Sequence, residues 1–163
     1  MRLSRIPRAV PLLAGLLLAA CGGGQAPPPG VEAQAPMQED AVAHIGDDVR
    51  VRASVLPTAR LNAAVAAQYG VTPSPGTVLV LVGVRQGPET DEAALPATLD
   101  AHAFDLRGVR QDLPLRPVSS GNLLDYVGVV WITPPDSLRF DIDVRLDDGR
   151  RTRLRFSRDV FPE

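Results

Sequence analysis

The sequence predicts an all-β domain, an antiparallel β-sandwich of about seven strands with one short inserted helix at about residues 58–69. Three observations support this prediction. Polar and apolar residues alternate with a period of two from Gly46 onward, turn residues recur roughly every ten positions, and a single segment has helical spacing. With 45% hydrophobic and 22% charged residues, the 163-residue chain is too polar for a multi-span membrane protein and too apolar for a disordered one.

Seven segments have the composition of strands. In Val49–Val55 hydrophobic residues alternate with polar ones, which predicts a strand with one face in solvent, whereas Thr77–Val84 is apolar on both faces and predicts a central strand. Pro114 and Pro117 remove amide donors and predict an edge strand around them. The predicted strands are Val49–Val55, Thr77–Val84, Leu99–Leu106, Val109–Leu115, Leu123–Ile132, Leu138–Leu146 and Thr152–Phe156.

One helix is expected between the first two strands. Thr58 is its candidate N-cap and Gly70 its candidate C-terminal stop. Leu61, Val65 and Tyr69 are spaced four residues apart, so they form a narrow apolar stripe along one face. We expect this stripe to pack over an opening of the sheets, with Tyr69 as a core contact.

The first twenty-one residues predict a lipoprotein signal. Met1–Arg8 contains three arginines and no acid, and the apolar run Ala9–Leu18 follows it. As a helix this run is about 15 Å long, half of the roughly 30 Å that a membrane span needs. The alternative, a buried N-terminal helix, would have to contain Pro11.

The residues Leu18-Ala19-Ala20-Cys21 are typical of a bacterial lipobox, in which the cysteine is lipidated before cleavage. We therefore expect removal of residues 1–20 and a permanent anchor of three acyl chains on Cys21. Gly22, in place of the Asp that favours inner-membrane retention, predicts an outer-membrane location facing the periplasm. Residues 21–45, rich in Gly, Pro and Ala, are expected to form a flexible linker that includes His44 and spans about 25–30 Å. The folded domain is then residues 46–163.

Composition limits the chemistry of this domain. All 17 basic residues are arginines; loss of the three in the signal leaves 14 against 19 acidic residues, a net charge of −5 that argues against a nucleic-acid partner. The single cysteine precedes the domain, which excludes disulfides, cysteine-ligated zinc and a cysteine nucleophile within it. We predict no metal site and no cofactor. Trp131 is expected in the core, and without a Cys–Trp–Cys framework any immunoglobulin-like character is architectural.

Acidic residues near the last turn suggest a calcium loop at first sight. Asp141 and Asp143 share a strand face and precede the sequence Asp147-Asp148-Gly149. The calcium-loop pattern requires an oxygen ligand at its fifth position, however, and Arg145 occupies it.

A hairpin explains the same residues better. If Asp147, Asp148 and Gly149 form a three-residue loop, with Gly149 left-handed, the apolar residues of both strands share one face. On the other face Asp143 then pairs with Arg153 and Asp141 with Arg155. We therefore predict an exposed, structural charge ladder of four residues, with a metal or ligand role as the less favoured alternative.

His102 is the other candidate for chemistry. A two-residue turn after Leu106 would pair Asp105 with Arg110 and put His102 on a semi-apolar face, two residues from Asp100. Ser119-Ser120 supplies hydroxyls, but the sequence contains no Gly-x-Ser-x-Gly elbow. We therefore interpret His102 as a partly buried structural residue and predict no catalytic residues.

The order of segments PTARLNAAVAAQYGV, PGTVLVLVGV, LDAHAFDLRGVRQDLPLRPV, DYVGVVWI, LRFDIDVRL and TRLRFSRDVF resembles a family of small exported bacterial proteins known as DUF 4426. The resemblance covers about Gly46–Phe161, and its most specific parts are the helix end Ala66–Gly70 and the strand Phe140–Val144. It implies an immunoglobulin-like β-sandwich without an assigned activity, so no site residues are transferred. The lipid anchor, the long linker and the acidic loop Glu89–Glu92 depart from the family pattern.

These observations favour a non-catalytic binding or envelope-assembly module tethered to the membrane. A protein partner is expected to pair with a free sheet edge, that of the first or last strand. The alternative is a small-molecule or lipid-binding sandwich with a pocket under the helix at 58–70. An enzyme is the least favoured reading.

Overall fold

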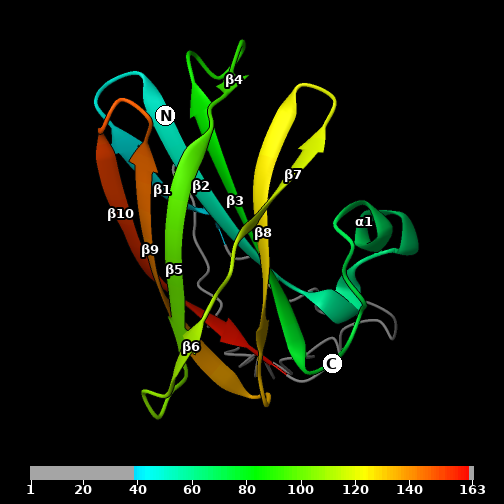
Figure 1. Ribbon diagram of the computed structural model, residues 1–163. Coiled ribbons are helices and arrows are strands. Elements are labelled where there is room, and N and C mark those ends of the chain that lie inside the picture. Colours follow the sequence, from blue (N-terminus) through cyan, green and yellow to red (C-terminus); the bar gives the residue numbers. More distant parts are fainter. Residues whose placement is uncertain (1–38, 162–163) are drawn as a thin grey trace, which may run out of the picture. The chain divides into compact units, whose positions relative to one another are not determined.

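The computed structural model describes residues 39–161, which form two antiparallel β-sheets packed as a sandwich (Figure 1), and confirms the predicted fold class. Sheet A contains, in spatial order, β1 (Ala41–Ile45), β2 (Val49–Pro57), β3 (Thr77–Gln86), β8 (Leu123–Trp131) and β7 (Arg116–Ser120), with β4 (Ala93–Ala94) paired to β3. Sheet B contains β10 (Arg151–Val160), β9 (Asp136–Leu146), β5 (Ala97–Phe104) and β6 (Arg110–Asp112). Among residues 39–161 no helix is long and apolar enough to span a membrane.

The core lies between the two sheets and is built mainly from branched aliphatic side chains. In β3 and β9 every second residue points inward, as strand geometry requires. Because β-branched residues pack well on a pleated surface, these side chains are fully buried although aromatic residues are few. The fully buried core members from these two strands are Val78, Val80, Val82, Val84, Leu138, Phe140, Ile142 and Val144.

The last hairpin has the predicted register. Gly149 is left-handed (φ 86°), and the amide of Leu146 donates to the carbonyl of Arg150 across a three-residue loop. On the inner face Phe140 stacks on Phe156 with ring centroids 5.1 Å apart. On the outer face arginines of β10 stand opposite aspartates of β9.

The hairpin between β5 and β6 corrects the predicted register by one residue. Phe104, and not Asp105, stands opposite Arg110, because the loop contains three residues and Gly108 is left-handed (φ 81°). The Asp105 carboxylate accepts hydrogen bonds from the amides of Arg107 and Val109 and thereby stabilises this longer loop. This turn has the same design as the last hairpin, a loop of three residues ending in a left-handed glycine.

The strand predicted at 109–115 is shorter than expected, since only β6 lies within it, and a second edge strand, β7, follows in the other sheet. Leu113 is buried, and its amide donates to the carbonyl of Ala101 at the end of β6. Pro114 has no amide donor to continue that ladder, and the chain crosses to sheet A, where β7 contains Pro117. This second strand, together with β1 and β4, accounts for ten strands where about seven were predicted.

The folded unit begins earlier than predicted. Residues 41–45, assigned above to the linker, form β1, and His44 therefore lies in a strand opposite Arg50. Ile45 is buried, whereas Val42 and His44 point outward, so the short segment has the alternation of a strand. Two of its residues on the inward side, Ala41 and Ala43, are alanines, whose weak hydrophobic signal explains why the composition suggested a linker.

The first and last strands lie side by side (Figure 1). The side chain of Arg158 in β10 donates to the carbonyl of Glu39, directly before β1. The outer edges of β1 and β10 therefore face each other, which leaves little room for the expected pairing of an extended partner with either strand.

The helix predicted at about residues 58–69 is shorter in the structure. This segment contains a 3-10 turn, η1 (Thr58–Arg60), and the helix α1 (Ala63–Gln68). Asn62, and not Thr58, is the N-cap, because its side chain accepts a hydrogen bond from the third helical amide (2.9 Å). Thr58 is instead fully buried, with its hydroxyl bonded to the loop that leads into β3. Gly70, left-handed with φ 59°, ends the helix as predicted.

Trp131 does not lie in the core. It is the last residue of β8 and faces outward opposite Thr77, so its side chain is exposed. The buried aromatic residue of this strand is Tyr126, whose hydroxyl accepts a hydrogen bond from the amide of Ala97 (2.7 Å). The alternation along β8 thus points Tyr126 inward, where its hydroxyl has a hydrogen-bond partner, and points the indole of Trp131 outward.

Candidate functional site

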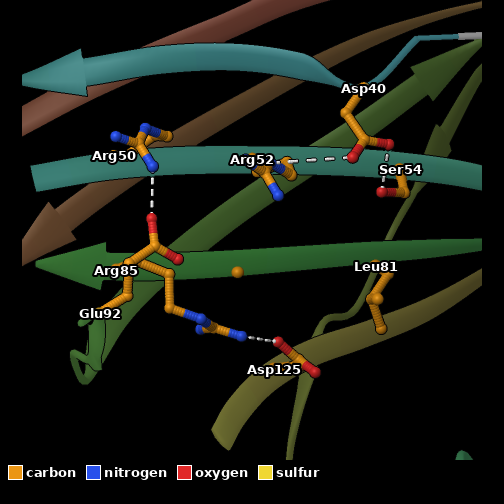
Figure 2. Close-up of a pocket in the computed structure, with 9 residues that line it drawn as sticks. Asp40, Arg50, Arg52, Ser54, Leu81, Arg85, Glu92 and Asp125 are labelled. Atoms are coloured by element: carbon orange, nitrogen blue, oxygen red, sulfur yellow. Dashed lines mark hydrogen bonds and ion pairs between the residues drawn. The ribbon is translucent and has the colours of Figure 1, made fainter. Parts of the chain in front are cut away.

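A polar hollow of about 250 Å³ opens on the outer face of sheet A. Figure 2 shows three arginines and three carboxylates that face one another across neighbouring strands. Alternation along β2 and β3 turns these side chains away from the core, and the antiparallel register brings the two strands' outward residues together. The residues that line the polar hollow are Asp40, Arg50, Arg52, Ser54, Leu81, Gly83, Arg85, Glu92 and Asp125.

The floor of the polar hollow is the ion pair between Arg85 of β3 and Asp125 of β8 (Figure 2). Their side chains are only 15% and 13% exposed. The Arg85 guanidinium also donates to the carbonyl of Leu124 (2.9 Å), so most of its charge is satisfied without water. Gly83 makes room for it, because a Cβ there would lie 3.2 Å from the guanidinium atoms.

The rim of the polar hollow has two further pairs. Arg50 of β2 binds Glu92, and Glu89 lies 3.3 Å from the same guanidinium. Arg52 is 3.8 Å from Asp40, whose carboxylate also accepts a hydrogen bond from Ser54. The positive and negative groups of the lining therefore balance, and Arg52 has the longest ion-pair distance among them.

Tyr69, at the end of α1, is electrostatically coupled to this floor. Burial raises the pKa of the Tyr69 phenol above its usual range, and the negative charge of Asp125 raises it further. The backbone carbonyl of Tyr69 accepts a hydrogen bond from Arg116 of β7. Tyr69 is half-buried at the outer surface of sheet A, and is thus not the contact of the main core that its helical spacing suggested.

A second hollow of about 540 Å³, lined by both polar and apolar side chains, lies at the end of the sandwich where β8 ends. Leu106 and Val109 come from the turn between β5 and β6, and Trp131 comes from β8. Pro135, from the loop before β9, and Asp136, the first residue of β9, complete one wall. Neither of the two hollows described in residues 39–161 is lined by a residue of α1, so neither is the pocket under the helix considered above.

The predicted charge ladder is present on the outer face of sheet B. The Nε atom of Arg153 donates to Asp143 (2.7 Å), and that of Arg155 donates to Asp141 (3.2 Å). The hydrogen bond from Arg153 lowers the pKa of Asp143, and the same bond raises the pKa of Arg153. Cys21, the predicted lipidation site, lies outside the described residues.

His102 also belongs to this charged outer face, and not to a semi-apolar one. Its ring nitrogens lie 3.5 Å from Asp100 and 3.2 Å from Asp112, and Arg110 approaches both of them. Ser119-Ser120 lies in β7 of the other sheet, so the structure does not bring these hydroxyls to the imidazole. Within residues 39–161 no group of three or more His, Cys, Asp or Glu side chains has the geometry of a metal site.

Sequence reasoning missed both hollows. The partners Arg85 and Asp125 are 40 residues apart, and Arg50 and Glu92 are 42 apart, so no local spacing relates them. One signal was available, because arginines at the outward positions of Val49–Val55 and at the end of Thr77–Val84 predict a charged face.

Comparison with known proteins places residues 43–163 in a family model described as a domain of unknown function, DUF4426. A crystal structure of a DUF4426 family protein from Pseudomonas aeruginosa PAO1 is 23% identical, covering 77% of this chain and 98% of that one, with a TM-score of 0.65. No curated protein sequence matches the chain.

Two structures of FetP from uropathogenic Escherichia coli strain F11 are similar at 8% identity. One, isolated after expression in the periplasm, covers 76% of this chain and 96% of that one, with a TM-score of 0.52. The other, a copper-bound variant, covers 77% and 93% with a TM-score of 0.53. At these identities the three solved structures support the sandwich fold alone.

Proposed function

We propose that this chain, which belongs to the DUF4426 family of domains of unknown function, is a lipid-anchored, non-catalytic binding module of the bacterial envelope whose ligand site is the polar hollow on sheet A. The observation that carries the proposal is the ion pair of Arg85 and Asp125. The pair is largely shielded from water, yet it forms the floor of a hollow that is open to solvent.

The energetics of ion pairs argue for a binding role. Removing two charges from water costs about as much free energy as their attraction returns, so a shielded pair stabilises a fold no better than well-packed apolar residues do. Three arginines and three carboxylates in one small hollow are therefore poorly explained by stability. Such fixed charges are well suited to orient a polar ligand.

Arg52 indicates the chemistry of that ligand. Its side chain is 48% exposed, and it lies 3.8 Å from Asp40. At that distance the N–H donors of its planar guanidinium form no close hydrogen bond with that carboxylate. A carboxylate can accept two parallel hydrogen bonds from such a guanidinium. We therefore expect a carboxylate-bearing partner, an acidic peptide segment, to bind at Arg52 with Arg50 beside it.

Titration with the dipeptide N-acetyl-Glu-Glu-amide, followed by the NMR signals of the arginine Nε groups, tests the site. We expect shifts at Arg50, Arg52 and Arg85, and a loss of affinity of about tenfold or more in Arg52→Gln. Arg153→Gln, which removes a similarly exposed arginine from sheet B (46% against 48% for Arg52), is the matched control and should bind normally. Equal shifts on both sheets, or unchanged affinity in Arg52→Gln, would refute the site.

The proposed anchor depends on Cys21, the only cysteine of the chain, which directly follows Leu18-Ala19-Ala20. The proposed location is the outer membrane, with the domain in the periplasm. Metabolic labelling with a fatty acid should mark the wild-type protein, and Cys21→Ser should abolish both the label and membrane fractionation. A labelled Cys21→Ser protein would contradict the anchor.

A further inference from the structure

We propose that the end of the sandwich that carries Trp131 docks on the lipid bilayer as an interfacial contact surface. We call this surface the apolar end; it consists of Leu106, Val109, Trp131 and Phe161. The inference goes beyond the polar hollow and rests on the proposed function only for the anchor that brings the domain to the membrane.

The apolar end gathers most of the exposed hydrophobic surface of the domain. Residues 39–161 expose seven large hydrophobic side chains, and four of them lie here: Leu106 (72% exposed), Val109 (52%), Trp131 (70%) and Phe161 (65%). They come from the β5–β6 turn, the end of β8 and the residue after β10, which meet at the bottom of Figure 1. A cluster of this kind on a soluble domain marks an interaction surface.

Hydrogen bonds hold the backbone that carries three of these side chains. The amide group of Gln111 accepts from the backbone amide of Trp131 (3.3 Å) and donates to its carbonyl (2.9 Å), which joins β6 to β8. The Asp105 carboxylate closes the turn that presents Leu106 and Val109, and the amide of Val109 lowers the pKa of that carboxyl. The backbone that carries Leu106, Val109 and Trp131 is thus preformed, and little backbone entropy is lost when this surface binds.

The path of the chain indicates that the bilayer is the occupant. β1 runs from Ala41, opposite Ala53, away from the apolar end, and Glu39 before it accepts a hydrogen bond from Arg158, three residues before Phe161. Gly22–Glu39 separates the predicted lipid on Cys21 from the domain. As the flexible linker that its composition predicts, this segment would have an r.m.s. span of about 21–25 Å. To place the opposite end on the membrane, it would also have to extend along sheet A from about the level of Val55 to that of Val49, about 20 Å.

The chemistry of the apolar end suits the bilayer interface. Tryptophan is enriched at that depth because its ring is apolar and its N–H is polar, and Phe and Leu add apolar area. Arg107 follows Leu106 in this turn and is the more exposed member of its ion pair with Asp105. On a docked domain its guanidinium would bind lipid phosphates. In this orientation the polar hollow lies about 13–26 Å from the bilayer, on the face of sheet A, open to the periplasm.

The single tryptophan of the chain provides the measurement. The acylated full-length protein is reconstituted into phosphatidylethanolamine–phosphatidylglycerol vesicles with and without bromine-labelled lipid, and Trp131 emission is recorded. We expect a blue shift and bromine quenching in the wild type. Both effects should be largely lost in Leu106→Asp and retained in Leu123→Asp, which alters an exposed leucine at the opposite end.

Emission of water-exposed character, unquenched by bromine in vesicle-bound protein, would overturn the proposal. Shielding of Trp131 that appears only after membrane proteins are added would overturn it in favour of a protein occupant. Cys21→Ser protein, held on nickel-chelating vesicles by an N-terminal histidine tag, separates docking from acylation. Quenching there supports docking even if the acyl anchor proves wrong, and its absence refutes docking independently of the anchor.

Discussion

The two outer faces of the sandwich carry the same residue types in different physical settings. On sheet B, Arg153 and Asp143 form a cross-strand pair whose side chains are 46% and 49% exposed. On sheet A, Arg85 and Asp125 form a cross-strand pair shielded by the neighbouring backbone and the side chains of the hollow. Alternating charge along a strand thus identifies an outer face, but the neighbours of that face decide whether its ion pairs are a solvated ladder or a recognition surface.

Matched Asp→Ala substitutions break this comparison most directly. Asp125→Ala leaves the Arg85 guanidinium shielded and without its carboxylate, so we expect a loss of about 2–4 kcal/mol in the free energy of unfolding, less than for a fully buried pair. Asp143→Ala removes a solvated partner and should cost about 0.2–1 kcal/mol. Denaturant unfolding of both variants measures the difference. Equal losses would contradict the distinction between a shielded ion pair on sheet A and a solvated one on sheet B.

The pH dependence of stability sharpens the comparison at the sheet B ladder. Because Arg153 lowers the folded-state pKa of Asp143 below its unfolded value, the carboxylate contributes stability that is fully present above about pH 4. This contribution is lost as the pH falls through the lowered folded pKa. Asp143→Asn should therefore flatten the acid side of the stability profile slightly. If the free energy of unfolding falls as steeply at acid pH in Asp143→Asn as in the wild type, the ion pair with Arg153 does not contribute to stability.

The sequence predicted the ladder and missed the polar hollow for a single reason. The residues of the ladder flank one three-residue loop, so the hydrophobic pattern of two adjacent strands fixes every pair. The hollow instead joins β2, β3, β8 and the segments before β1 and β4, and its pairs depend on the order of strands in the sheet. Alternation provides no information about that order.

Local details limited the other predictions. The β5–β6 register was wrong by one residue because hydrogen bonds to the Asp105 side chain extend the turn. The strand predicted at 109–115 was too long because Pro114 ends the ladder of β6, and β7 then begins at Arg116 in the other sheet. Trp131 was assigned to the core on the basis of residue type, although the alternation of β8 places it outside with Val129. Here the period of the strand was a better guide than the hydrophobicity of the side chain.

The central claim, that the shielded charges of the polar hollow serve binding and not stability, is tested most directly by replacing Arg85 with Met and Asp125 with Leu in one protein. Both replacements fill similar volume without leaving a lone charge. The account predicts a melting temperature equal to or above that of the wild type, together with loss of N-acetyl-Glu-Glu-amide binding. A folded double variant that binds the peptide with unchanged affinity, or one whose melting temperature falls sharply, would contradict it.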